Sequence, residues 1–224
     1  FRKMNFKLGA GISSGDRMLY VGYSGNATTF DWNDITVEGA SNWASGSTGT
    51  KRVTLYSGVS LTLNNYSVSG TTYGDYEYGK NSNTTTPTAS TVTASELYFD
   101  VNRFQNADVK ASTAGAGSYA GTSTLGNTTN HNKYTLDTVV SNYAYAGYTQ
   151  SEAGDSTDNE VVITNGAYTT LYPSVPQIVG GYAKQGKAIN NKITLNGSGS
   201  AAAWNNLYGG YSENPSADAW TGNT

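Results

Sequence analysis

The chain contains no cysteine, so disulfide bonds, thiol catalysis and zinc–thiolate sites are all excluded. A eukaryotic secreted domain of this size commonly carries disulfides. Their absence favours either a cytosolic protein or a bacterial chain that stays reduced or unfolded during export. The chain also contains a single histidine, His131, so a metal site or catalytic site that needs two imidazole groups is excluded. His131 stands in a run of Asn and Thr residues, and we expect it to be a solvated loop residue.

Charged residues are scarce, at 13% of the chain against about a quarter in typical globular domains. The 13 Lys and Arg residues are dispersed and are outnumbered by 16 Asp and Glu residues, which gives a net charge of -3. This balance argues against a nucleic-acid partner, which would require a basic stripe. No apolar run reaches the ~18 residues of a membrane-spanning helix, so we expect no membrane insertion.

Small polar residues and aromatic residues make up much of the chain instead. Gly, Ser, Thr and Asn account for nearly half of the 224 residues, and there are 18 Tyr, 5 Phe and 4 Trp. A disordered chain would be poor in aromatics and rich in charge, so disorder throughout is not expected. Thr and Tyr favour strands, whereas Gly and Asn favour turns. The composition therefore predicts an all-β protein.

One pattern occurs nearly twice in the last third of the sequence. Val-Gly-Gly-Tyr at 179–182 is followed by a polar loop and by Asn-Lys-Ile-Thr-Leu at 191–195, and Leu-Tyr-Gly-Gly-Tyr at 207–211 starts the pattern again. Further Asn-led segments begin at Asn132 and Asn159. The leading residues Asn132, Asn159, Asn191 and Asn223 are separated by 27, 32 and 32 residues. The sequence is therefore a repeat with a period near thirty, and the variation falls in the loops.

Such a repeat predicts a parallel β-helix. Neither half of the unit can bury its apolar side chains alone, whereas stacked copies form a continuous core and pair each strand with its equivalent above and below. At a coil spacing of about 4.8 Å, roughly seven coils are expected. The leading Asn would either occupy a left-handed corner or join a ladder of stacked amides, and glycines would allow positive φ at the corners. An antiparallel β-sandwich is the alternative, because it too shows short strands joined by turns.

We expect residues 1–224 to form a single β-helical segment of a longer repeat protein, with an irregular, loop-rich region at about 70–130. Alternating apolar residues also predict strands at 35–37, 51–55 and 59–63. The apolar stretch at 96–109 has helical spacing through Leu97, Val101 and Phe104, but an alternating strand at Leu97, Phe99 and Val101 fits equally well, and we prefer the strand.

Acidic residues in three small groups are the candidates for carbohydrate-cleaving or calcium-binding chemistry. These groups are Asp31 with Asp34, Asp75 with Glu77, and Asp155 with Asp158 and Glu160. We expect them to be solvated turn residues and predict no catalytic, cofactor or metal site. A weak calcium site near Asp155 and Asp158 stays open as an alternative.

Tyrosines are the other candidates for binding. Tyr73, Tyr76 and Tyr78 lie close together and could stack on sugar rings, although we prefer that they cover strand ends. Tyr182 and Tyr211 occupy matched positions in the repeat, so we expect them to stack on each other within the rod.

The repeat units resemble the passenger region of bacterial autotransporter (type V secreted) proteins. In that family, units similar to Val-Tyr-Gly-Gly-Tyr, a polar loop and Asn-x-Val-Thr-Ile-x-Gly-Gly recur along a right-handed parallel β-helix. The resemblance is clearest at 179–197 and 207–224, fair at 145–166 and looser at 19–39, and residues 51–130 depart from it. It implies display on a Gram-negative cell surface, with adhesion or aggregation as the usual activity.

The first functional hypothesis is therefore a non-enzymatic bacterial cell-surface scaffold or adhesin. Its partners would be proteins or glycans at a cell surface, including other copies of itself, bound through exposed loops and coil faces; the ligand is not identified. One alternative is a carbohydrate-active β-helix enzyme, a lyase or hydrolase, that uses Asp155 and Asp158 in a groove. The other is a subunit of an extracellular filament, since open β-helix ends readily pair with further strands.

Overall fold

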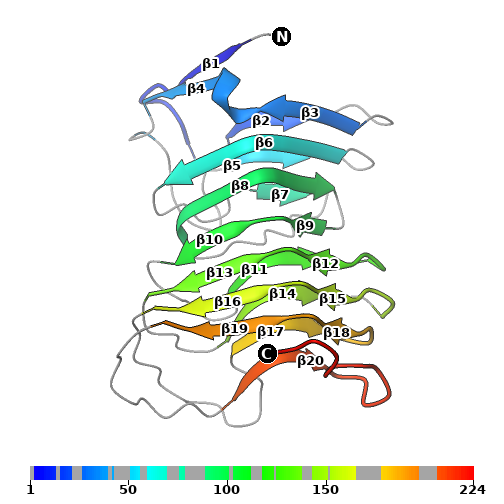
Figure 1. Ribbon diagram of the computed structural model, residues 1–224. Helices are drawn as coiled ribbons and strands as arrows, with labels where there is room; N and C mark the ends of the chain where they lie inside the picture. Colours follow the sequence, from blue (N-terminus) through cyan, green and yellow to red (C-terminus); the bar gives the residue numbers. More distant parts are fainter. Residues whose placement is uncertain are drawn as a thin grey trace.

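The computed structural model describes residues 3–13, 16–21, 27–39, 42, 51–55, 60–69, 76–78, 89–100, 103–111, 118–123, 125–137, 143–150, 152–164, 178–196 and 206–224. Within these ranges the regular structure is β-strand, apart from one 3-10 turn, η1 (Trp32–Asp34). The strands stack along one axis, with the N-terminal residues at one end and the C-terminal residues at the other (Figure 1). The fold is a parallel β-solenoid of about four turns. This confirms the predicted all-β parallel β-helix, and the β-sandwich alternative is wrong.

Three consecutive coils share one layout. The first face is formed by β11 (Ser118–Ser123), β14 (Ala144–Thr149) and β17 (Ile178–Ala183). A short corner strand follows in each coil, namely β12 (Thr129–Asn130), β15 (Ser156–Thr157) and β18 (Ala188–Ile189). The second face is formed by β13 (Lys133–Leu136), β16 (Glu160–Ile163) and β19 (Lys192–Leu195). A further coil starts with β20 (Leu207–Ser212).

Equivalent strands of successive coils pair in parallel and in register. Val161 pairs with Ile193 on the second face, and Tyr182 lies between Tyr148 and Tyr211 on the first face. Like side chains therefore stack on like, as the repeat predicted.

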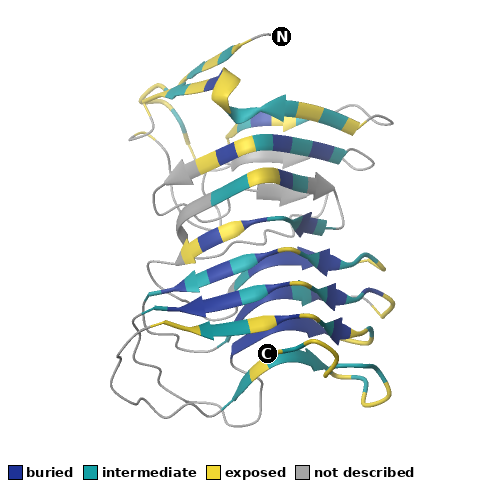
Figure 2. Cartoon of the chain, viewed as in Figure 1, coloured by how far each residue is buried: buried dark blue, intermediate teal, exposed yellow. Residues whose placement is uncertain are grey.

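Strand alternation explains where the core lies. On the second face, Tyr134, Leu136 and Val161 are fully buried in the interior, whereas the intervening Lys133 and Thr135 point outward. Burial is most continuous in the coils from β11 to β19 (Figure 2). These coils form the well-packed part of the solenoid.

The N-terminal strands pair mostly in parallel but less regularly. They are β1 (Met4–Lys7), β2 (Arg17–Val21), β3 (Ala27–Asp31), β4 (Ile35–Glu38), β5 (Lys51–Leu55), β6 (Ser60–Ser69) and β7 (Tyr76–Tyr78). Parallel pairs join β1 to β4, β3 to β6, and β2 to β5 to β7. The strands expected at 35–37, 51–55 and 59–63 are thus confirmed, with β6 extending further than predicted.

A long strand, β8 (Ala89–Asp100), interrupts the parallel stack. It runs antiparallel to β6, to β9 (Arg103–Gln105) and to β10 (Asp108–Ala111), and β9 is antiparallel to β11. Because β8 pairs with both β9 and β10, it joins the sheets of the two faces. The expected count of seven like coils is therefore wrong. The preferred strand at Leu97, Phe99 and Val101 is confirmed by β8 as far as Asp100, and Val101 lies outside the described residues. Regular coils resume at residue 118, inside the region expected to be irregular.

The sharp corner before the second face falls on the residue that precedes each leading asparagine. His131, Asp158 and Asn190 have φ values of 55°, 55° and 57°. Asn, Asp and His adopt this left-handed region more readily than other non-glycine residues. Glycine was expected at these corners, but among the second-face corners that the structure describes only the one before Asn223 has it, as Gly222 with φ 67°.

The leading asparagines instead form a buried amide ladder. The Asn159 Oδ1 accepts hydrogen bonds from the backbone N–H and the Nδ2 of Asn132, at 3.1 and 3.0 Å. The Asn191 Oδ1 accepts the same pair from Asn159, both at 3.0 Å, and the Asn223 Oδ1 accepts from the Asn191 backbone N–H at 2.7 Å. Asn132, Asn159 and Asn191 are each no more than 1% exposed. Of the two roles predicted for the leading asparagine, the ladder is the one observed.

The strand glycines make room for this ladder. A Cβ atom at Gly121 would lie 2.3 Å from the Asn132 side chain, and one at Gly147 would lie 2.5 Å from that of Asn159. Gly181 stands in the same relation to Asn191, at 2.2 Å. The glycine at the matched position of each first-face strand and the leading asparagine of the same coil therefore fit together as one steric unit.

Candidate functional site

The structure does not bring the acidic residues of the third predicted group together. The Asp155 Oδ1 accepts a hydrogen bond from the Lys187 backbone N–H at 2.7 Å, and Glu160 pairs with Lys192 at 3.5 Å. Asp158 is exposed at its corner. Among the residues that the structure describes, no three His, Cys, Asp or Glu side chains gather as metal ligands would. Asp155 and Glu160 therefore have structural partners.

The other predicted candidates are dispersed as well. Asp31 caps the 3-10 turn by accepting from the Asn33 backbone N–H at 2.9 Å, and its Oδ2 accepts from Asn65 Nδ2 at 3.0 Å. Asp34 is exposed. The remaining candidates, Tyr73, Asp75 and the side chains of Tyr76, Glu77 and Tyr78, lie outside the described part of the structure, although 76–78 form β7.

Charges of alternating sign run along the outer surface of the second face. Asp108, Lys133, Glu160 and Lys192 occupy equivalent positions on β10, β13, β16 and β19. Neighbouring strands lie about 4.8 Å apart, where like charges directly opposite each other would be destabilising. Desolvation raises the pKa of the Asp108 carboxyl, while Lys133 lowers that pKa and Glu160 raises it. The alternation makes this surface nearly neutral.

Tyrosines on the first face form a second buried cluster. Ala144 and Ala146 belong to the main core cluster, whereas Tyr145, between them, belongs to this second cluster. The stacked pairs in this tyrosine column are Tyr119–Tyr148 with ring centroids 4.6 Å apart, Tyr143–Tyr145 at 4.8 Å and Tyr145–Tyr182 at 4.8 Å. Tyr182 also contacts Tyr211 at 5.3 Å, as predicted for these two residues. The column links successive coils to each other beside the main core cluster.

Burial changes the acidity of these phenols. It raises the pKa of Tyr119, Tyr145 and Tyr182, because a phenolate would lose its hydration there. The Tyr182 hydroxyl also donates a hydrogen bond to the Glu213 carboxylate, which raises its pKa further. These hydroxyls stay protonated at neutral pH and hold the column uncharged.

We predict that the protein loses stability steeply in alkali. In the unfolded chain tyrosine ionises near pH 10, whereas the folded column holds its protons to higher pH. The free energy of unfolding is therefore unchanged by these groups below about pH 10 and falls as the pH rises above it. Tyrosinate absorbance, recorded with circular dichroism during an alkaline titration, should show ionisation of the column coinciding with unfolding. Ionisation of all tyrosines near pH 10 in a chain that stays folded would contradict this.

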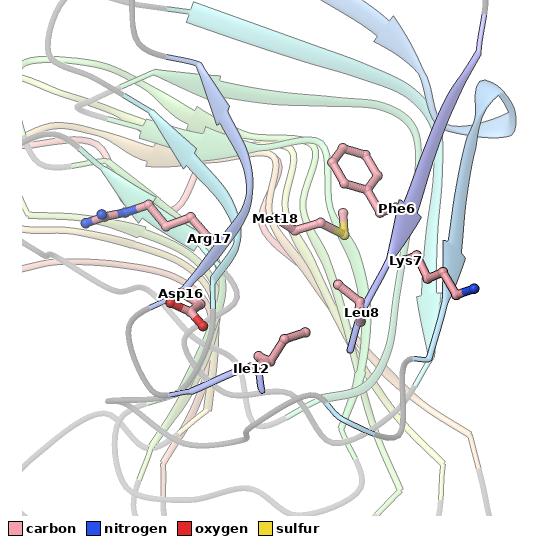
Figure 3. A pocket seen from close by; sticks show the side chains of 7 residues that line it. All are labelled: Phe6, Lys7, Leu8, Ile12, Asp16, Arg17 and Met18. Atoms are coloured by element: carbon pink, nitrogen blue, oxygen red, sulfur yellow. The ribbon is translucent and has the colours of Figure 1, made fainter. Parts of the chain in front are cut away.

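A small hollow with both apolar and charged lining residues opens at the N-terminal end of the solenoid. It has a volume of about 290 Å³ and lies between β1 and β2. Phe6, Leu8, Ile12 and Met18 extend into it, whereas Lys7 points away (Figure 3). Its apolar lining joins the hydrophobic core, with which Phe6 packs. It is the open end of that core.

A second hollow lies at the corner where β8 breaks the parallel stack. It has a volume of about 400 Å³. Its floor contains the buried residues Tyr66 and Ala107, and the left-handed corner residues Asn65, Asn106 and His131 stand around it. We call it the corner hollow. Asp108 and Lys133, the first two residues of the alternating charge row, also line it.

Connections between coils differ sharply in length from one edge of the solenoid to the other. Two residues join each corner strand to the second face, at 131–132, 158–159 and 190–191. The links from the second face to the next coil are longer and unequal, at 137–143, 164–177 and 196–206. These links all leave from one edge, because Leu136, Ile163 and Leu195 are in register. Sequence variation between coils is therefore concentrated at that edge.

Comparison of the chain with models of known families, with curated proteins and with solved structures found no match. In the part of the chain that the structure describes, no helix has the length and apolar character needed to cross a membrane.

Proposed function

We propose that this chain is a non-enzymatic scaffold or adhesin of the bacterial cell surface, which binds host or neighbouring-cell ligands through one edge of its solenoid. The observation that carries the proposal is the asymmetry of the connections. One edge has invariant two-residue corners locked by the amide ladder, while the other carries links of seven, fourteen and eleven residues. In repeat proteins, insertions of unequal length on one face commonly form the binding surface.

Composition supports an extracellular location. A chain without cysteine can pass through an export pathway without forming wrong disulfides, and a solenoid stabilised by stacked side chains and amide ladders does not need them. Asp155 accepts a hydrogen bond from the Lys187 backbone and Glu160 pairs with Lys192, which gives these two acids a structural role. These features favour a scaffold over the enzyme alternative.

Display on a non-adherent bacterial strain, through a heterologous surface anchor, tests this proposal. We expect displayed chain to promote adhesion to cultured epithelial cells or clumping of the bacteria. Replacing residues 165–177 with a short Gly-Ser linker should abolish most of that adhesion without changing the thermal unfolding of the purified protein. The matched control is Lys184→Ala with Gln185→Ala, two exposed residues that follow β17 on the way to the corner.

Two results would count against the scaffold. Adhesion that is absent, or is unaffected by replacing 165–177, would refute binding at the variable edge. Release of new reducing ends from bacterial or host polysaccharides, lost in an Asp155→Ala, Asp158→Ala variant, would establish the carbohydrate-active enzyme instead.

A further inference from the structure

The corner hollow exists because two kinds of coil meet there. In the regular coils each corner residue stacks on the next, as the Asp158 backbone N–H donates to the Ile189 carbonyl and the Asn190 N–H donates to the Thr221 carbonyl. Between Asn65 and Asn106 the antiparallel strand β8 passes instead, with Ala94 and Ser95 at this point. These short side chains leave space that a regular corner would fill. At about 400 Å³ the hollow falls within the ~300–1,000 Å³ of ligand pockets.

The polar groups around this hollow are available to a ligand. Within the described residues, no side-chain hydrogen bond engages the Lys133 Nζ, the Asp108 carboxylate or the Asn106 amide, although Lys133 is near enough to lower the pKa of the Asp108 carboxyl. This differs from the next coils, where Glu160 pairs with Lys192 and its Oε1 accepts from the Thr194 hydroxyl at 2.6 Å. Lys133 is half-buried, so fewer water molecules can solvate its ammonium group in place of a hydrogen-bond partner. Away from the hollow, Glu160 and Lys192 of the charge row thus have side-chain partners. Asp108 and Lys133, which border the hollow, have no such hydrogen bond.

The kind of ligand follows from the mixture of charges. An anion such as phosphate would meet Lys133 but also the carboxylates of Asp108 and Glu160, its neighbours on either side in the charge row. A divalent cation would have one carboxylate and would be repelled by Lys133. An uncharged ring bearing several hydroxyls avoids both problems, because each hydroxyl can donate to a carboxylate and accept from an ammonium or amide group.

We propose that the corner hollow binds one uncharged, hexose-sized sugar ring. Asp108 accepts hydrogen bonds from its hydroxyls, Lys133 and Asn106 donate to them, and Tyr66 and Ala107 form the floor against which the ring rests. The corner is held open by the left-handed conformations of Asn106 and His131. This inference rests on the proposed function only in taking a glycan as the natural ligand; the hollow itself lies on the corner, away from the variable edge.

His131 provides a direct readout of binding, because it is the only histidine in the chain and lines the hollow. Its imidazole C–H signals can be followed by NMR during titration with methyl β-galactoside, methyl α-glucoside, methyl α-mannoside and N-acetylglucosamine. We expect at least one of these sugars to shift the His131 signals saturably at millimolar concentration. Glycine and inorganic phosphate, titrated in the same way, should leave the signals in place.

Two matched pairs of variants test the assignment. Asn106→Gly keeps a residue that accepts positive φ and removes the amide, and Asn190→Gly does the same at an equivalent corner outside the hollow. Lys133→Met and Lys192→Met remove two lysines from equivalent positions in the charge row. We expect sugar binding to weaken about tenfold or more in Asn106→Gly and in Lys133→Met, and to be unchanged in the two controls.

The proposal is overturned if none of the four sugars moves the His131 signals, or if glycine or phosphate moves them more than any sugar does. Equal weakening in Asn106→Gly and Asn190→Gly would also overturn it, because the effect would then come from the fold. Adhesion of displayed chain separates this inference from the proposed function. Adhesion without sugar binding refutes the corner site alone, and sugar binding without adhesion refutes the adhesin.

Discussion

Replacing Asn159 with alanine is expected to lower the free energy of unfolding by about 4 kcal/mol. The Asn159 side chain accepts from the Asn132 backbone N–H at 3.1 Å and donates to the Thr129 carbonyl at 3.1 Å. Each buried group that loses its partner costs about 1–3 kcal/mol, and the vacated space adds to the loss. Because Asn159 is 1% exposed, water cannot replace the amide without entering the core.

Urea unfolding, followed by far-UV circular dichroism, measures this loss. The matched control is Asn196→Ala, which removes an exposed asparagine next to β19 and should change stability by less than about 0.5 kcal/mol. Equal effects of the two substitutions would show that the amide ladder does not stabilise the solenoid. Asn159→Asp should not rescue the loss, since a carboxylate cannot donate to the Thr129 carbonyl and would face the Asn191 Oδ1.

Replacing Gly147 with alanine should be nearly as damaging, by about 3 kcal/mol. The added Cβ would lie 2.5 Å from the Asn159 side chain, which cannot turn aside because its amide is hydrogen-bonded to the coils above and below. Overpacking of this kind forces shifts of the backbone and typically costs about 1–3 kcal/mol. Gly11→Ala is the control, because a Cβ there meets no atom within 4 Å.

The double variant Gly147→Ala, Asn159→Ala distinguishes a steric clash from a requirement for glycine flexibility. If the methyl group at position 147 clashes with the amide, truncating the amide removes the obstacle. The double variant should then be more stable than the sum of the two single losses by at least about 1 kcal/mol. Strict additivity would show that Gly147 is needed for another reason.

Gly147 and Asn159 illustrate how much of the structure could be predicted from the repeat pattern. Matched spacing of Asn132, Asn159 and Asn191 predicted stacked coils, and the parallel register of Val161 with Ile193 confirms this. The role of the glycines was predicted only in part: Gly222 takes a left-handed corner as expected, whereas Gly147 makes room for an amide. A glycine in a repeat signals a special backbone conformation or a close approach, and sequence alone does not separate the two. Here the close approach of Asn159 to Gly147 is the reason.

The candidate sites could be predicted less well. Asp155, Asp158 and Glu160 are near each other in sequence, but Asp155 and Glu160 have structural partners and the three do not gather as metal ligands would among the described residues. The corner hollow combines Asn65, Asn106 and His131, which are far apart in sequence and are brought together by strand pairing. The His, Asp or Asn residue that precedes most of the leading asparagines is a signal that could have located the corners, because these residue types adopt the left-handed region more readily than other non-glycine residues. Nothing in the residues of β8 indicated that it runs against its neighbours.

The sequence by itself determined the all-β class, the stacking of coils and the tyrosine contacts, because periodicity forces equivalent residues together whatever the loops do. Only the tertiary structure decided that the amides form a buried ladder, that the glycines receive them, and that β8 reverses direction to open a hollow. Those outcomes depend on which side chains meet across coils, and contacts between residues so far apart in the chain are set by register and packing rather than by local sequence.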